Sequence, residues 1–173
     1  MTDWAQVYQT TYDDLVRFLY RKVWDADRAQ DLAQETFVRC LREAARMRTI
    51  TNVRAFVFTI ATNLARDEAR TVLRRKQHLV LLKNEAATSP HAEAEIEAIE
   101  RARRVAAVEA ALSDLSERDR EILLLWDAGL SYQEIAQQTG LAIGAIGTTL
   151  SRARRRLVDT YEQIERQTHV ARG

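Results

Sequence analysis

Apolar residues recur every three or four positions along much of the chain, which is the spacing of one face of an α-helix. A clear run of this kind is Val53, Phe56, Val57, Ile60, Ala61 and Leu64. Two more runs lie upstream: Leu15, Phe18, Leu19 and Val23, and then Leu32, Phe37, Val38 and Leu41. The pattern predicts three helices packed around a shared core, and Trp4 with Tyr8 suggests the start of a fourth helix.

The C-terminal half continues with helical spacing. A long helix, interrupted near Ser113, is predicted by Ile96, Ile99, Val105, Val108, Leu112 and Leu115. The segment from Ser116 to Asp119 has the form S-x-x-D, which is typical of a helix start. Gly129 is placed to end the helix that begins there.

Ser131 and Glu134 form the S-x-x-E pattern of a capping box, which marks the start of another helix. Gly140 favours the left-handed backbone that ends such a helix, and a further helix is predicted from Ile143 to about Tyr161. Two helices joined by a glycine turn are a helix-turn-helix candidate. The second helix exposes side chains suited to a phosphate-lined groove: Thr148, Thr149, Ser151, Arg152, Arg155 and Arg156. The alternative is a helix pair that binds nothing, with a solvated arginine face.

Five Gly and one Pro in 173 residues leave few turn positions, so an all-α fold is expected. The single proline, Pro90, lies in the small-residue stretch 84–90, which is typical of a linker. We therefore predict two small helical domains, residues 1–76 and 93–165, joined by a linker at 77–92 and followed by a tail at 166–173.

Charge is informative only locally. Lys plus Arg number 26 and Asp plus Glu number 25, so the net charge of +1 argues neither for nor against nucleic-acid binding. Residues 1–76 carry 14 basic and 10 acidic side chains, a net of +4. Residues 143–158 contain four arginines and no acid, so the last predicted helix is strongly basic.

Several function classes are disfavoured by composition. Cys40 is the only cysteine and cannot form an internal disulfide, and the three histidines lack the spacing of a zinc site. We find no glycine-rich phosphate loop and no nucleophile with an identifiable base, so neither an enzyme nor a cofactor is expected. No apolar run is long enough to span a bilayer and no signal peptide is evident, which favours the cytoplasm.

Three segments together resemble the extracytoplasmic-function (ECF) group of bacterial sigma factors, the promoter-recognition subunits of RNA polymerase. Residues 31–37, DLAQETF, resemble the D-x-x-Q-E-x-F signature of region two. Residues 53–75 are similar to the promoter-melting helix, and residues 115–121 with 129–136 are similar to region four. The resemblance implies a region-two bundle in residues 1–76 and a region-four helix-turn-helix at about 131–157.

The resemblance also implies partners and contact residues. Core RNA polymerase would be bound through its beta-prime clamp helices and beta flap, with docking at Asp31, Gln34, Glu35 and Phe37. The −10 element would be contacted by Asn63, whose amide suits a flipped base, and by Arg66, Arg70, Arg74 and Arg75. The −35 element would be contacted by Thr148, Thr149, Arg152, Arg154 and Arg155. An anti-sigma factor is the expected regulator.

The chain departs from the family pattern at the start of its last predicted helix. Residues 143–149 read IGAIGTT where V-G-T-V-[KR]-S-R is common, so Gly147 and Thr149 replace two usual cations. Weaker or altered readout at −35 is therefore expected. The alternative function is a stand-alone dimeric helix-turn-helix regulator, which would leave residues 1–76 unexplained.

Overall fold

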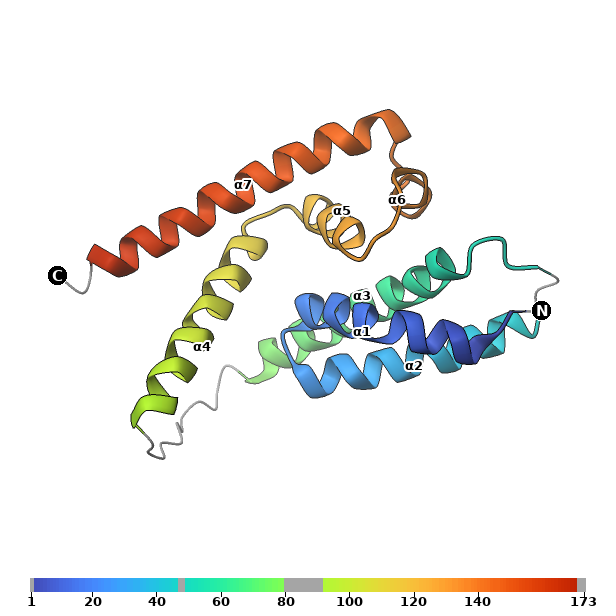
Figure 1. Ribbon diagram of the computed structural model, residues 1–173, viewed down its shortest axis with the longest axis horizontal. Coiled ribbons are helices and arrows are strands. Elements are labelled where there is room, and N and C mark those ends of the chain that lie inside the picture. Colours follow the sequence, from blue (N-terminus) through green and yellow to red (C-terminus); the bar gives the residue numbers. More distant parts are fainter. Residues whose placement is uncertain (1, 47–48, 80–91, 171–173) are drawn as a thin grey trace.

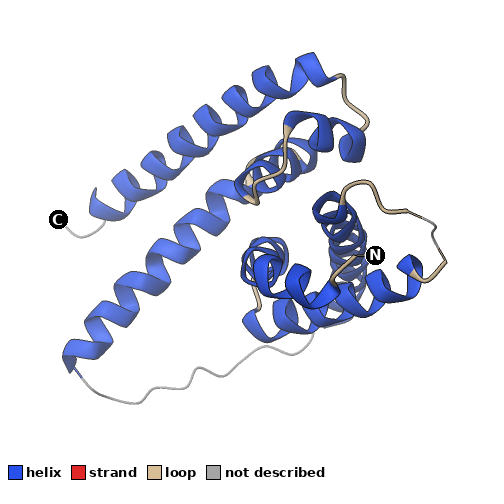
Figure 2. Cartoon of the chain, turned by 45° about the vertical axis from the view of Figure 1, so that its right-hand side comes forward, coloured by secondary structure: helices blue, strands red, loops and turns tan. Residues whose placement is uncertain are grey.

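The computed structural model describes the backbone of residues 2–46, 49–79 and 92–170, and the side chains of 2–46, 49–70 and 96–168. This part of the chain is helical with no strand, as the composition predicts (Figures 1 and 2). In chain order the helices are α1 (Trp4–Val23), α2 (Ala26–Ala44), α3 (Val53–Leu79), α4 (Ala92–Ser113), α5 (Glu117–Asp127), α6 (Tyr132–Thr139) and α7 (Ile143–Val170).

Helices α1, α2 and α3 pack on one another as an N-terminal bundle (Figure 1). Asp3 caps α1 by accepting the backbone N–H groups of Ala5 and Gln6, and the helix then continues unbroken to Val23. Trp4 and Tyr8 therefore belong to the first helix, and the expectation of a separate fourth helix is wrong. The turn into α2 is made by Trp24, which has a positive φ of 54° and donates its backbone N–H to Tyr20.

The core of the bundle follows the apolar stripes with two differences. Leu15, Leu19, Leu32 and Val57 are fully or almost fully buried, as their spacing predicts. Val38 and Leu41 on α2 are instead exposed. The sequence pattern also missed Phe58, a fully buried ring that packs edge-on against Phe18 with centroids 5.3 Å apart.

Helices α4 to α7 form the C-terminal half. The predicted interruption at Ser113 is confirmed, because α4 ends there and Ser116 caps α5 by accepting the backbone N–H of Asp119 at 3.1 Å. Helix α7 crosses the other three helices of this half and buries Ile146, Leu150 and Ala153 against them. Asp114, just beyond α4, accepts a hydrogen bond from Arg156 on α7 at 3.1 Å.

Two helices extend past the limits that the sequence suggested. Helix α3 continues to Leu79, beyond the predicted start of the linker, and α7 continues to Val170 through most of the predicted tail. Pro90 and the remaining linker residues 80–91 lie outside the described residues.

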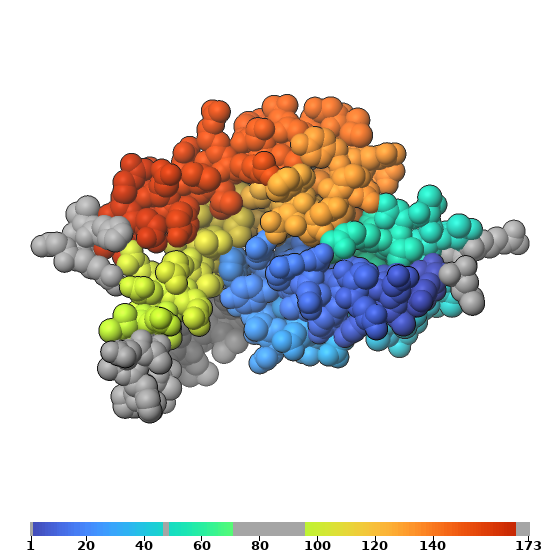
Figure 3. All heavy atoms as spheres, viewed as in Figure 1, coloured from blue at the N-terminus to red at the C-terminus, as the bar shows by residue number. Residues whose placement is uncertain are grey.

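The N-terminal bundle and the C-terminal half are in contact. Helices α5 and α6 lie against α1 and α3, so that the two groups of atoms meet directly in the space-filling view (Figure 3). Buried apolar residues of both halves form one continuous cluster.

Candidate polymerase and nucleic-acid interfaces

Helix α2 presents a surface of mixed polarity to solvent. Asp25 caps the helix by accepting the backbone N–H of Arg28, and the helical period then places Asp31, Gln34, Val38 and Leu41 on one exposed face. Glu35, beside this face, accepts a hydrogen bond from Arg39. We call Asp31, Gln34, Glu35, Val38 and Leu41 the α2 face. It combines two apolar side chains with a polar rim, which is the usual composition of a protein interface.

Phe37 does not belong to the α2 face. Its side chain is only 7% exposed and packs in the bundle core, with its ring centroid 4.9 Å from that of Tyr8. The expectation that Phe37 contacts the polymerase is therefore corrected: its role is to hold α2 on α1. The D-x-x-Q-E-x-F pattern thus combines three surface positions with one core position, and the apolar members of the surface are Val38 and Leu41.

Helix α3 carries the predicted −10 contacts on the side opposite its core stripe. Ala61, Leu64 and Ala65 are buried, whereas Asn63 and Arg70 are exposed. Nη1 of Arg70 lies 3.7 Å from Oδ1 of Asp67, which is one helical turn earlier. Arg74 and Arg75 lie in α3, but their side chains are outside the described residues.

Arg66, the remaining −10 candidate, forms an ion pair with the C-terminal half of the molecule. Its Nη2 donates to both carboxylate oxygens of Glu121 on α5, at 2.7 and 2.9 Å. The pair borders a cavity of about 720 Å³ between α3 and α5, whose charged lining comprises Arg66, Arg70, Glu117, Arg118, Arg120 and Glu121. Three of the predicted −10 side chains thus have described positions, and one of these binds the other half of the molecule.

The helix-turn-helix begins at the predicted capping box. Ser131 accepts the backbone N–H of Glu134 at 3.3 Å, and the Glu134 carboxylate accepts the backbone N–H of Ser131. Partial burial by itself raises the pKa of Glu134, but these hydrogen bonds and one donated by Asn52 outweigh it, and the net pKa is lowered. Gly140 ends α6 with a φ of 72°, as its position predicts.

Helix α7 divides its predicted −35 residues between surface and interior. Thr148, Arg152 and Arg155 are exposed at helical spacing and define what we call the α7 face. Thr149 is buried and donates its hydroxyl to the carbonyl of Ala145 at 2.8 Å. The guanidinium of Arg154 lies 3.8 Å from the ring centroid of Trp126, so it packs on α5.

One of the two departures from the family pattern, Thr149, has a structural explanation. A cation at position 149 would lie inside the domain, where Thr149 is buried. A Cβ at Gly147 would make ordinary van der Waals contact with Cε2 of Tyr132 at 3.5 Å, so nothing in the structure explains the glycine at this position. Sequence reasoning missed this contact because Tyr132 belongs to the polar, exposed side of the capping-box helix.

The described residues contain neither a metal-binding cluster nor a membrane-spanning helix. In the ranges given above, no group of three or more His, Cys, Asp or Glu side chains is arranged to hold a metal ion. None of the described helices is long and apolar enough to cross a bilayer.

Comparison with known proteins assigns both halves. Residues 7–76 match the family described as "Sigma-70 region 2", and residues 106–157 match "Sigma-70, region 4". The chain is 34% identical over 139 residues to the ECF RNA polymerase sigma factor EcfG of Rhodopseudomonas palustris, covering 77% of this chain and 71% of the relative. It is 29% identical over 149 residues to the RNA polymerase sigma factor YlaC of Bacillus subtilis, covering 86% of each.

Solved structures agree with this assignment. The sigma factor RpoE from Bartonella quintana, in complex with the anti-sigma factor NepR, superposes with a TM-score of 0.69 and 27% identity, over 94% of this chain and 98% of that one. CnrH in complex with the cytosolic domain of CnrY gives a TM-score of 0.67 at 22% identity, over 92% and 88% of the chains, which supports the fold.

The chain therefore belongs to the sigma-70 family of RNA polymerase sigma factors, and the region-two and region-four resemblance is confirmed. Within that family it is an ECF sigma factor, and it directs transcription initiation. A stand-alone dimeric regulator is not favoured, because the N-terminal bundle is a sigma region in its own right.

Proposed function

We propose that this sigma factor binds core RNA polymerase through the α2 face. The supporting observation is that Val38 and Leu41 are exposed beside Asp31, Gln34 and Glu35, whereas Leu32 and Phe37 on the same helix are buried. Two exposed apolar side chains on a short helix lose solvent contact only when a partner covers them. The beta-prime clamp helices and the beta flap of the core enzyme are the proposed partners.

A pull-down with purified core enzyme tests this surface. We expect the double variant Gln34→Ala, Glu35→Ala to be retained about tenfold less than wild type, since polar rim contacts of a small interface contribute about 1 to 2 kcal/mol in total. The matched control is Glu43→Ala, Arg46→Ala, an exposed ion pair of 3.2 Å near the end of the same helix. Equal retention of both double variants and wild type would show that another surface docks the polymerase.

We propose further that α3 and α7 contact promoter DNA. Asn63, Arg66 and Arg70 lie on the side of α3 that suits a separated strand at −10. The α7 face, Thr148, Arg152 and Arg155, is free of acidic side chains and suits a major groove at −35. Thr149 is not retained in this proposal because it is buried, and Arg154 is not retained because its exposed guanidinium already stacks on Trp126. Start-site mapping after transcription with core enzyme tests both assignments.

No step in this function requires a catalytic group of the chain, and we propose that it acts in the cytoplasm as a non-enzymatic subunit of the polymerase. An anti-sigma factor is its proposed regulator. The support is the likeness to RpoE of Bartonella quintana, whose structure was solved in complex with the anti-sigma factor NepR. Co-purification of the chain with a co-expressed anti-sigma candidate, and loss of transcription on its addition, would test this.

A further inference from the structure

A small apolar cavity lies between the C-terminal end of α1 and the middle of α4. Its volume is about 280 Å³, and its apolar lining comprises Tyr20, Trp24, Val105 and Val108. This cavity is separate from the larger, charged one between α3 and α5. Its size suits a molecule somewhat smaller than a typical drug.

The wall that α1 contributes is aromatic and preformed. Trp24 follows the last turn of α1 with its φ of 54°, and its backbone N–H donates to the carbonyl of Tyr20 at 2.7 Å. The two rings meet edge to face with centroids 5.4 Å apart. Both are partly buried against the core, so the protein itself holds this wall in place and a ligand need not order it.

The wall that α4 contributes is one face of that helix. Arg101, Arg104, Val105 and Val108 lie at the spacings i, i+3, i+4 and i+7, and all four line the cavity. Helix α4 packs on α7, and Val108 remains 36% exposed. The two valines complete the apolar lining, and the two exposed arginines add positive charge to it.

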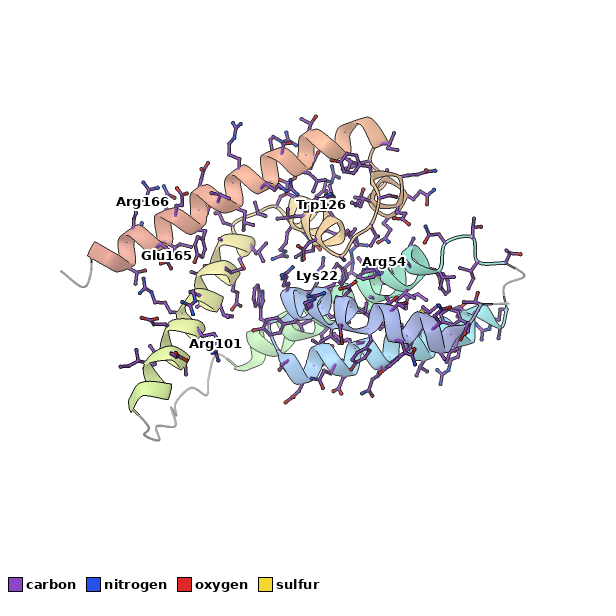
Figure 4. All side chains as sticks on the ribbon, viewed as in Figure 1. Lys22, Arg54, Arg101, Trp126, Glu165 and Arg166 are labelled. Carbon is purple, nitrogen blue, oxygen red and sulfur yellow. The ribbon has the colours of Figure 1, made fainter. Side chains whose placement is uncertain are left out.

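Arg101 and Arg104 have no ionic partner within the part of the chain that the structure describes. Glu97 and Glu100 each precede one of them by four residues, yet neither forms an ion pair with it. Arg103, between them, turns instead to α7 and pairs there. Arg101 extends from α4 toward the N-terminal bundle (Figure 4).

The cavity therefore combines apolar surface with unpaired positive charge. A third lining arginine, Arg21, is already paired with Asp127 of α5, and none of the described lining residues is acidic. A guanidinium binds a carboxylate through two parallel hydrogen bonds, a geometry that the compact ammonium of lysine lacks. A neutral apolar molecule would leave both free guanidiniums unpaired, and a polyanion would place its remaining charges against apolar side chains.

We propose that this cavity binds a small organic carboxylate. The apolar body of the ligand lies against Tyr20, Trp24 and the valines, and its carboxylate binds Arg101 and Arg104. No residue assigned above to polymerase or promoter contact lines the cavity. The sigma factor thus has a small-molecule site, formed by α1 and α4 together, in addition to its macromolecular partners.

NMR titration of the free chain with 4-phenylbutyrate tests the site. The ¹H–¹⁵N spectrum contains one side-chain N–H peak for each of the three tryptophans, and Trp24→Phe identifies the Trp24 peak by its loss. We expect the ligand to shift this peak with a dissociation constant of about 1 mM, as suits about twelve heavy atoms. The peaks of Trp4 and Trp126 should stay in place. The neutral analogue 4-phenyl-1-butanol should bind about tenfold more weakly, because it lacks the charge.

The double variant Arg101→Gln, Arg104→Gln tests the carboxylate contact. We expect it to bind 4-phenylbutyrate about tenfold more weakly than wild type. The matched control is Arg42→Gln, Arg118→Gln, which loses the same net charge at two exposed arginines outside this cavity. The control should bind as wild type does.

Val108→Phe tests the apolar part of the site without changing its charge. The larger side chain fills the cavity while both guanidiniums remain, so the Trp24 shift should be lost. Far-ultraviolet circular dichroism verifies that every variant keeps its helices.

Each result has a defined meaning. A Trp24 peak that stays unshifted at about 10 mM 4-phenylbutyrate overturns the proposal, and so does a shift of all three tryptophan peaks, which marks non-specific binding. Equal affinity for the acid and the alcohol, equal affinity of the two double variants, or undiminished binding by Val108→Phe overturns it as well. The titration uses the free chain, so its outcome is independent of transcription with core enzyme, which tests the proposed function.

Discussion

At the scale of single residues, the surroundings of a side chain decide its role more than its type does. Cys40 is fully buried in α2, and burial raises the pKa of its thiol to about 12, so the thiol stays protonated. Cys40 is therefore a packing residue of the N-terminal bundle. Phe37 and Thr149 were expected at interfaces, yet both are buried, because the helical period turns them inward from their exposed neighbours.

Asn63 shows how an exposed amide on a well-packed helix can be tested cleanly. Because its neighbours Thr62 and Leu64 are buried and Asn63 is exposed, Asn63→Ala removes the amide without disturbing the core. We expect run-off transcripts from a cognate promoter to fall about tenfold, the loss of one good base contact, with core binding unchanged. Thr59→Ala, one turn earlier on the exposed side of α3, is the control, and equal transcript yields from the two variants would remove Asn63 from the proposed site.

At the scale of helices, local sequence signals gave correct starts and ends where a cap fixes the backbone. Ser116, Ser131 and Gly140 all act as predicted, since each hydrogen bond or left-handed residue is set by near neighbours. The apolar stripes predicted the core residues less completely. Phe58 was missed because α3 contacts both α1 and α2, which buries more than one line of its side chains. Val38 and Leu41 fit the apolar pattern but face outward.

Gly147 gives a prediction at this scale. It lies within α7 with open space for an added methyl group except for ordinary contact with Tyr132 at 3.5 Å. Glycine in a helix interior is about 1 kcal/mol less favourable than alanine, so Gly147→Ala should stabilise the protein by about 0.5 to 1 kcal/mol. Urea denaturation followed by circular dichroism measures this. Gly129→Ala, at a φ of 85°, should instead destabilise, and a loss of stability in both variants would mean that α6 and α7 pack too closely for the methyl group.

At the scale of the whole molecule, the sequence predicted two halves but not how they meet. The Arg66 to Glu121 contact joins residues 55 apart, and the Arg21 to Asp127 contact joins residues 106 apart. No local pattern marks Glu121 among the 25 acidic residues as buried, because the packing of α5 on α1 and α3 determines its partners. Ion pairs between residues far apart in the sequence could therefore be identified only from the structure.

Acid should weaken the whole molecule through carboxylates at this interface. The hydrogen bond from Arg54 lowers the pKa of Asp14 below its ordinary 3.8, and the pKa of Glu134 lies below its ordinary 4.5. Since unfolding raises both pKa values, the unfolded chain binds more protons, and the stabilisation present above those ordinary values is lost as pH falls through the lowered ones. The urea concentration at the unfolding midpoint should therefore decrease as the pH is lowered from about 5 to about 3.

The variant Asp14→Asn should show a shallower decline over that range, because it lacks one of the two titrating groups. Asp13→Asn is its control, since Asp13 is exposed and has no ion pair with a described side chain. Parallel pH profiles for the two variants would mean that Asp14 does not link pH to stability.

The pairing of Arg66 with Glu121 also changes how the free protein should respond to salt. Added ions screen the partly exposed pairs that hold the halves together, and they equally weaken the attraction of arginine for a phosphate backbone. Screening of the ion pairs releases Arg66, whereas screening of the phosphates reduces the DNA affinity that the released Arg66 contributes. The free chain should therefore lose affinity for single-stranded DNA less steeply with ionic strength than Glu121→Gln, whose slope reports phosphate neutralisation alone.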